Sequence, residues 1–271
     1  MHVLTSGEGI QDQQALDFYR DALQTLAGAD VPFLVGGAYA FHRYAAIARY
    51  TKDFDIFMMS RDVDRAIAVL ATRGYDAKLL YPHWLGKVQS GDAFMDVIFN
   101  SGNGVVPVDD EWFDHAQQAE VLGLTMLLCP VEEMIWSKSF VIERERADAA
   151  DVAHLLRHCA GWLNWHRLIR RYGANWRVLL AHLVLFGFIY PDERAKIPEA
   201  VMRELMGRVD RELTVNGTDR VCNGTLLSRE QYLVDVEKWG YEDARLFPRG
   251  SMTPEDIEIW TAAIDEEGKK D

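Results

Sequence analysis

The chain has 271 residues, of which 49% are apolar, enough for one or two domains with a substantial core and too many for a disordered or fibrous protein. Its 42 acidic and 29 basic side chains give a net charge of −13, which disfavours general affinity for nucleic acid or anionic membranes. The three cysteines are widely spaced and lack a Cys-x-x-Cys pair, so neither a disulfide framework nor a thiolate zinc site is predicted.

The N-terminal residues lack the basic start and apolar core of a signal peptide. The longest apolar stretch, Val178–Tyr190, contains His182 and has about half of the roughly 20 residues that a membrane helix needs. We therefore expect a cytoplasmic protein without a membrane-spanning segment. The oligomeric state is left open by the sequence.

The first half of the chain alternates helical and extended patterns. A double glycine, Gly36-Gly37, separates an apolar run from a helical one, and Gly91-Asp92 separates two strand-like runs in the manner of a hairpin. Hydrophobic spacing predicts helices at 12–28, 38–44 and 63–73 and strands at 31–35, 53–59, 75–81, 84–90 and 93–99.

Beyond Pro130 the spacing becomes helical. The pattern predicts helices at 132–156, 162–172, 176–190 and 199–213, and a further packed helix at 232–239 that could close over a cleft. We expect an α+β protein with a mixed sheet flanked by helices, followed by a mainly helical C-terminal region. The predicted boundary separates residues 1–128 from residues 129–271.

Three carboxylates on the predicted strands are the most informative feature. Residues i and i+2 of a strand point to the same face, with Cα atoms about 6.5–7 Å apart, so Asp53 and Asp55 converge. Like charges so placed repel unless a cation lies between them, and carboxylate oxygens suit Mg²⁺. Asp96 lies on an otherwise apolar strand, where a carboxylate without a partner is costly. It also requires a cation or a proton.

Gly36 and Gly37 lie where a predicted strand gives way to a helix. Without Cβ atoms, their backbone N–H groups can approach a phosphate closely, and the helix N-terminus favours the anion. Taken alone, the pair is more often a tight turn. Together with the three acids, it predicts phosphate and Mg²⁺ in one cleft.

These residues resemble the signature of the nucleotidyltransferases of the DNA polymerase β superfamily. In that family an apolar strand, a Gly-Gly or Gly-Ser pair and a helix precede Asp-x-Asp on a strand and a third acid on a later strand. The match covers about residues 31–100 and has a long interval, 38–52, like that of the AbiE toxin-like and antibiotic-nucleotidyltransferase branches. The resemblance implies Asp53, Asp55 and Asp96 as catalytic metal ligands, and Gly36, Gly37, Thr51 and Lys52 as nucleotide-binding residues.

A shorter resemblance to the AbiE toxin-like branch continues beyond residue 130. That branch carries a lysine on a helix after the third acid, then basic residues and two acids three apart. The matching residues here are Lys138, Asp148 and Asp151. The resemblance implies that Lys138 reaches a nucleotide phosphate and that the two acids orient Lys138 or an acceptor group; the alternative is an ordinary exposed helical lysine.

Residues 152–191 contain five arginines and no acid, interleaved with aromatic side chains, in a chain that is otherwise acidic. This block either forms a surface for triphosphate or RNA or packs as a helical core whose arginines pair with acids from the flanking segments. The net charge favours the second interpretation. His154 and His158 have zinc-ligand spacing, but no third ligand is evident.

The sequence as a whole predicts a Mg²⁺-dependent enzyme, with two ions, that moves a nucleoside monophosphate from an NTP to an acceptor hydroxyl and releases pyrophosphate. The negative charge favours a small-molecule acceptor, such as a cationic antibiotic, over nucleic acid. Two alternatives remain open: a toxin-like transferase that modifies tRNA or protein, and a nucleotide-binding module without turnover.

Overall fold

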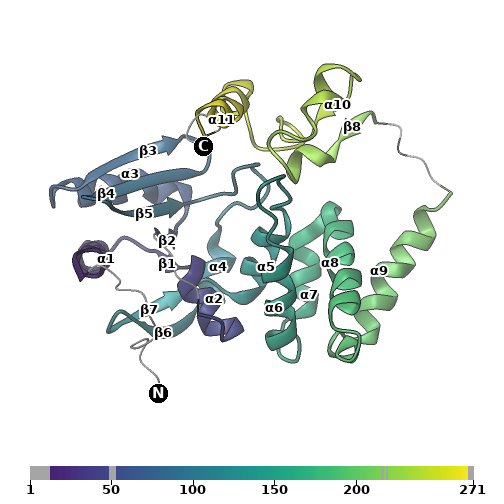
Figure 1. The fold of residues 1–271 in the computed structure, drawn as a ribbon, viewed down its shortest axis with the longest axis horizontal. Helices are drawn as coiled ribbons and strands as arrows, with labels where there is room; N and C mark the ends of the chain where they lie inside the picture. The colour runs from purple at the N-terminus through teal and green to yellow at the C-terminus, as the bar shows by residue number, and fades with distance from the viewer. Residues whose placement is uncertain (1–12, 49–52, 215–216, 218, 268–271) are drawn as a thin grey trace.

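A computed structural model describes residues 13–48, 53–214, 217 and 219–267. Within them a seven-stranded mixed sheet lies beside a group of helices, which the chain enters after the last strand of the sheet (Figure 1). The strand order is β3-β4-β5-β2-β1-β7-β6. This architecture confirms the predicted fold class, a mixed sheet flanked by helices followed by a mainly helical C-terminal region.

The sheet strands are short, and most coincide with the predicted ones. β1 pairs with β2 antiparallel and with β7 parallel, whereas β2 pairs with β5 parallel. The strands are β1 (Leu34–Val35), β2 (Asp53–Phe57), β3 (Asp76–Tyr81), β4 (Leu85–Ser90), β5 (Ala93–Ile98), β6 (Gln117–Val121) and β7 (Leu124–Leu128).

Alternation along the strands separates a buried face from a polar face. On the buried face, Phe54 lies 5.1 Å, between ring centroids, from Tyr19 of α1 (Gln13–Gly28). A Cβ on Gly86 of β4 would lie 3.5 Å from Ile67 of α3 (Ser60–Ala71), so α3 covers the same face. Because side chains alternate, Asp55 and its neighbours in the sheet lie on the opposite face.

The helices continue after β7. They are α5 (Val131–Ser139), α6 (Ala149–Cys159), α7 (Trp165–Tyr172), α8 (Trp176–Ile189) and α9 (Glu199–Glu212), with α2 (Gly37–Ala45) and α4 (Asp110–Asp114) inside the sheet-forming half. The hydrophobic core is continuous from the sheet into these helices, and α2 packs against α6. The proposed boundary between residues 128 and 129 falls between β7 and α5.

One predicted helix is wrong. Residues 132–156 form two helices, α5 and α6, separated by a loop in which Ile142 bridges Ala147. The break follows from local hydrogen bonding: Asp148 N–H donates to the Val141 carbonyl, and Glu143 N–H donates to the Arg146 carbonyl, which turns the chain back on itself. The loop sets α6 beside α5 and brings residues 146–151 toward Lys138.

The C-terminal residues return to the sheet. The predicted helix at 232–239 is only the short α10 (Leu233–Glu237), which follows β8 (Val221–Cys222) and precedes β9 (Glu242–Asp243). The terminal helix, α11 (Pro254–Glu267), lies against β3, where Trp260 stacks edge-on with Tyr81 at 5.1 Å (Figure 1).

By length and composition alone, one stretch of the described residues could cross a membrane. It is Trp165–Ile189, with a mean hydropathy of 1.3 in its most apolar window, and it comprises α7 and α8. In this protein Leu179, Leu183 and Phe186 of α8 are buried in the core, and Arg167 of α7 is buried in ion pairs. Core helices of soluble proteins pass the same test of length and composition.

Candidate active site

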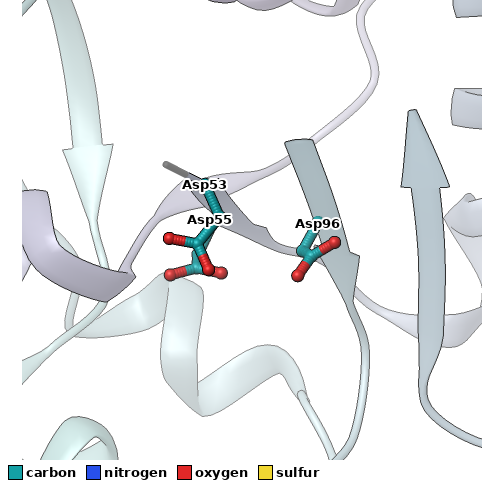
Figure 2. A group of neighbouring side chains, drawn as sticks. All are labelled: Asp53, Asp55 and Asp96. Carbon is teal, nitrogen blue, oxygen red and sulfur yellow. The ribbon is translucent and has the colours of Figure 1, made fainter. Parts of the chain in front are cut away.

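Parallel pairing of β2 and β5 assembles the three predicted carboxylates on the polar face of the sheet. The register places Asp55 opposite Asp96, and Asp53 lies two residues before Asp55 on the same face. Ligand oxygens from the three side chains lie within 4.8 Å of one another (Figure 2). Among the residues that the structure describes, this is the group of acidic, histidine or cysteine side chains close enough to hold a metal ion.

The double glycine leaves the space that the Asp55 side chain occupies. Gly37 has a φ of +51°, and a Cβ there would lie 1.8 Å from Asp55 Oδ2. A Cβ on Gly36 would lie 2.3 Å from the Phe57 ring, and the Gly36 N–H donates to the Asp55 carbonyl at 3.0 Å. Both glycines are therefore required by the close approach of β2, and the Gly36 N–H is already engaged with the sheet.

Asp55 is the most perturbed of the three acids. Burial, together with the charges of Asp53 and Asp96, raises the pKa of Asp55 to about 7, although Lys138 and Arg146 oppose the rise. Burial also raises the pKa of Asp96, against the influence of Lys87. Asp55 and Asp96 therefore resist simultaneous ionisation, so the site favours a cation.

The donor set fits a divalent metal ion. All candidate ligand atoms are carboxylate oxygens, which Mg²⁺ and Mn²⁺ prefer. In addition, Asp96 Oδ1 is buried without a hydrogen-bond partner and has the Lys87 ammonium at 3.4 Å, a position that favours a cation. The residues therefore fit a metal ion of this class.

A second cluster lies beside the acids. Lys138 of α5 donates to Asp148 at 3.0 Å and to Asp151 at 2.8 Å, where Asp148 precedes α6 and Asp151 lies in its first turn. Arg146, in the loop, donates to both oxygens of Asp148 at 3.1 Å. Arg146 remains largely exposed, and Asp148 holds a lowered pKa because Arg146 and Lys138 outweigh the effect of its burial.

The structure thus brings together most of the predicted site. Gly36 and Gly37 adjoin the acids, and Lys138 contacts both Asp148 and Asp151 as the resemblance implied. Their roles in nucleotide binding stay predictions. Two further predicted nucleotide-binding residues, Thr51 and Lys52, lie outside the described residues.

Two basic residues of the site were not predicted. Arg146 and Lys87 both act electrostatically on the acids, and Lys87 Nζ lies 3.4 Å from Asp96 Oδ1. Lys87 could have been found from the sequence, because counting back from the Gly91-Asp92 turn pairs it with Asp96. Arg146 lies among the basic residues of the AbiE-like motif but was given no role, since the predicted helix at 132–156 hid the loop that contains it.

The arginines of residues 152–191 are paired. Arg157 contacts Glu193, Arg170 contacts Glu111, and Arg177 contacts Glu212, whereas Arg167 and Arg171 are held in the core by Glu132, Glu133 and Asp109. Their acidic partners come from both flanking segments, as the second interpretation predicted. The histidine pair forms a helical turn contact, with His158 Nδ1 3.2 Å from the His154 carbonyl.

Comparisons with known proteins give only distant matches. No protein-family model matches the chain, and no curated protein does. Among solved structures, the antibiotic-resistance factor ANT(2'')-Ia matches with 16% identity over 64% of this chain and 96% of that chain, at a TM-score of 0.42. The lincosamide antibiotic adenylyltransferase LnuA matches with 12% identity over 55% of this chain and 98% of that chain, at a TM-score of 0.37.

An antigenic nucleotidyltransferase-like protein from Paracoccidioides brasiliensis matches with 11% identity over 68% of this chain and 92% of that chain, at a TM-score of 0.44. With TM-scores below 0.5 and identities under 25%, these similarities do not bear on the activity of this chain.

Proposed function

We propose that this protein is a metal-dependent nucleotidyltransferase that moves a nucleoside monophosphate from an NTP to an acceptor hydroxyl. The observation that carries the proposal is the convergence of Asp53, Asp55 and Asp96 from two parallel strands onto one point, with ligand oxygens within 4.8 Å. Bound Mg²⁺, two ions in this scheme, would supply Lewis-acid activation of the α-phosphate and neutralise the leaving pyrophosphate. Asp53 and Asp55 would hold one ion, and Asp55 and Asp96 the second.

The protein's own residues would position both reactants. Lys138 and Arg146, fixed by Asp148, lie beside the acids and are suited to the triphosphate oxygens. The acceptor oxygen attacks the α-phosphorus, the bond to the β-phosphate breaks, and pyrophosphate leaves. Asp96 would also help to deprotonate the acceptor hydroxyl and would take up its proton.

The resemblance to the AbiE toxin-like branch enters at this cluster. Asp148 and Asp151 both bind the ammonium of Lys138, at 3.0 and 2.8 Å, which supports the role of orienting this lysine that the resemblance implies. Membership of that branch, a cytoplasmic location and the division into domains at residues 128 and 129 are parts of this proposal.

For the acceptor we propose a small molecule. A net charge of −13 repels nucleic acid at long range and attracts cationic compounds. The five arginines that could have offset this repulsion locally are each paired with an acid. Arg167 is buried, and the side chain of Arg171 is only 9% exposed. A surface built for RNA would instead expose unpaired cations.

The decisive experiment is a screen of the four NTPs against small-molecule hydroxyl acceptors, tRNA and protein, read out by NTP binding with and without Mg²⁺, by pyrophosphate release and by the mass of the products. The proposal predicts metal-dependent release and an acceptor heavier by one nucleoside monophosphate. Modified tRNA or protein would establish the toxin-like alternative, and nucleotide binding without turnover would establish a binding module. The absence of metal-dependent NTP binding would contradict all three.

A further inference from the structure

A lysine occupies the sheet position next to the third acid. The register of β4 and β5 pairs Lys87 directly with Asp96, and Asp96 pairs with Asp55 across β2. Paired residues share a face of the sheet, so Asp55, Asp96 and Lys87 form a row across three adjacent strands. Lys78 of β3, the partner of Lys87, extends this row to the edge of the sheet.

The register of this row is fixed by local sequence. Gly91, with a φ of +60°, closes the tight turn between β4 and β5 and so sets every pair of the hairpin. Gly86, the residue before Lys87, faces α3 on the other side of the sheet. Lys87 therefore has its side chain on the polar face, beside the acids.

Lys87 makes two contacts there. Its Nζ lies 3.4 Å from Asp96 Oδ1 and 3.9 Å from the centroid of the Phe94 ring. The first contact is an ion pair without hydrogen-bond geometry, since Asp96 Oδ1 has no hydrogen-bond partner. Lys87 is 28% exposed, so its ammonium can leave Asp96 for water at low cost.

We propose that Lys87 is a displaceable counter-ion of Asp96. Without nucleotide, the Lys87 ammonium takes the place of the second metal ion and lowers the affinity of the Asp96 site for a metal ion. The nucleotide offsets this effect with its own negative charge. This inference rests on the proposed function. An ammonium 3.4 Å from a ligand oxygen competes directly with a cation at that oxygen. The ion held by Asp53 and Asp55 would then bind first, and the ion at Asp96 would bind tightly only together with the triphosphate.

The test is a titration of the full-length, nucleotide-free protein with Mn²⁺ alone, in which bound metal is measured by electron paramagnetic resonance. We expect Lys87→Met to tighten Mn²⁺ binding at the Asp96 site about tenfold, because the competing charge is gone. Lys87→Arg keeps the charge and should stay within about twofold of the parent protein. Thermal unfolding checks that each variant is folded.

Lys78→Met is the matched control. Lys78 lies on the same row and carries the same charge, but it is 56% exposed and pairs with Asp76 at 2.9 Å. Its removal should change Mn²⁺ affinity by less than about twofold. An equal effect of the two substitutions would reduce the role of Lys87 to that of general surface charge and would overturn the proposal.

A double-mutant comparison tests whether Lys87 acts on Mn²⁺ affinity through Asp96. In an Asp96→Asn background Lys87→Met should leave Mn²⁺ affinity unchanged, because the lysine acts through Asp96. If the parent protein binds Mn²⁺ through Asp55 and Lys87→Met binds it no more tightly, the counter-ion role is wrong and the metal site stands. If the parent, Lys87→Met and Asp55→Asn proteins all fail to bind Mn²⁺, the proposed metal site fails as well.

Discussion

Two clusters of acidic side chains lie within this protein, and they differ in how their charge is balanced. In the core between α5 and α7, Glu132 and Glu133 contact Arg167 at 2.5 and 2.6 Å, and Arg171 joins Glu133 to Asp109. On the polar face of the sheet, three aspartates converge with Lys87 as a cation at 3.4 Å. We call these the core ion cluster and the acidic triad.

The pKa directions differ between Asp109 of the core ion cluster and Asp55 of the acidic triad. Burial alone would raise the pKa of Asp109, yet Arg171 brings it below its ordinary value. Burial raises the pKa of Glu133, and Arg167 and Arg171 oppose that rise. For Asp55, by contrast, burial and the neighbouring acids act in the same direction and raise the pKa to about 7. In the core ion cluster each acid is balanced by an arginine, as in a structural ion pair. In the acidic triad the negative charge exceeds the nearby positive charge, which is typical of a ligand-binding site.

We expect the largest effect from substitutions in the acidic triad. Asp53→Asn together with Asp55→Asn should reduce nucleotidyl transfer about a thousandfold or more, because the ligands of the first metal ion are lost. The fold should persist, since the two substitutions remove repulsion between neighbouring carboxylates. Transfer is measured by pyrophosphate release and folding by circular dichroism. Metal-dependent transfer at the parental rate would refute the assignment of both residues.

In the core ion cluster, by contrast, we expect a substitution to lower the stability of the fold. Arg167→Met leaves the buried Glu132 and Glu133 without their shared partner, which we expect to cost about 3 kcal/mol of unfolding free energy. Arg203→Met, which removes an exposed helical ion pair with Glu199, should cost less than about 0.5 kcal/mol. Urea unfolding of both variants measures the difference. Equal costs would show that burial does not distinguish the two ion pairs.

Within the triad, Asp96 should behave as a group used in the transition state. Asp96→Asn should keep nucleotide affinity within about threefold, since Asp53, Asp55 and Lys138 remain, while transfer falls about a hundredfold. Nucleotide binding by calorimetry and turnover on an identified acceptor separate the two effects. Near-parental turnover would remove Asp96 from the catalytic set and leave it as a structural acid.

The raised pKa of Asp55 predicts a pH-dependent stability. Its folded-state value of about 7 exceeds the ordinary 3.8, so the folded protein holds this proton more tightly than the unfolded chain. Metal-free stability should therefore decline as the pH rises from about 4 through 7. At about pH 8, Asp55→Asn should be more stable than the parent by about 4 kcal/mol, and at about pH 4 the two should be nearly equal. Urea titrations at both pH values test this; equal stability at the higher pH would contradict the assigned shift.

Local patterns predicted much of the sheet and the triad. The Gly91 turn gave the β4–β5 hairpin, and the alternation of apolar and polar residues gave β2 and β5 within two residues of their observed ends. Asp53 and Asp55 were found because alternation places both on one face of a strand, and Asp96 was found because it interrupts an otherwise apolar strand. Their mutual approach also depended on the parallel pairing of β2 with β5, which no local pattern encodes.

The remaining features depend on contacts between distant segments. The β6–β7 hairpin was not predicted, because its turn places Leu122 at a φ of +53°, a conformation that leucine rarely adopts. The break between α5 and α6 depends on the hydrogen bond from Asp148 N–H to the Val141 carbonyl. Likewise, the sequence showed five arginines but not their partners, because Arg167 and Glu133 are 34 positions apart.

The most direct test of the account is the position of a metal in this protein. Crystals grown with Mn²⁺ and a non-hydrolysable NTP analogue would show the metal by its anomalous scattering. The account predicts peaks between the carboxylates of Asp53, Asp55 and Asp96, with the triphosphate directed toward Lys138 and Arg146. Anomalous density elsewhere, with the three carboxylates unliganded, would contradict it.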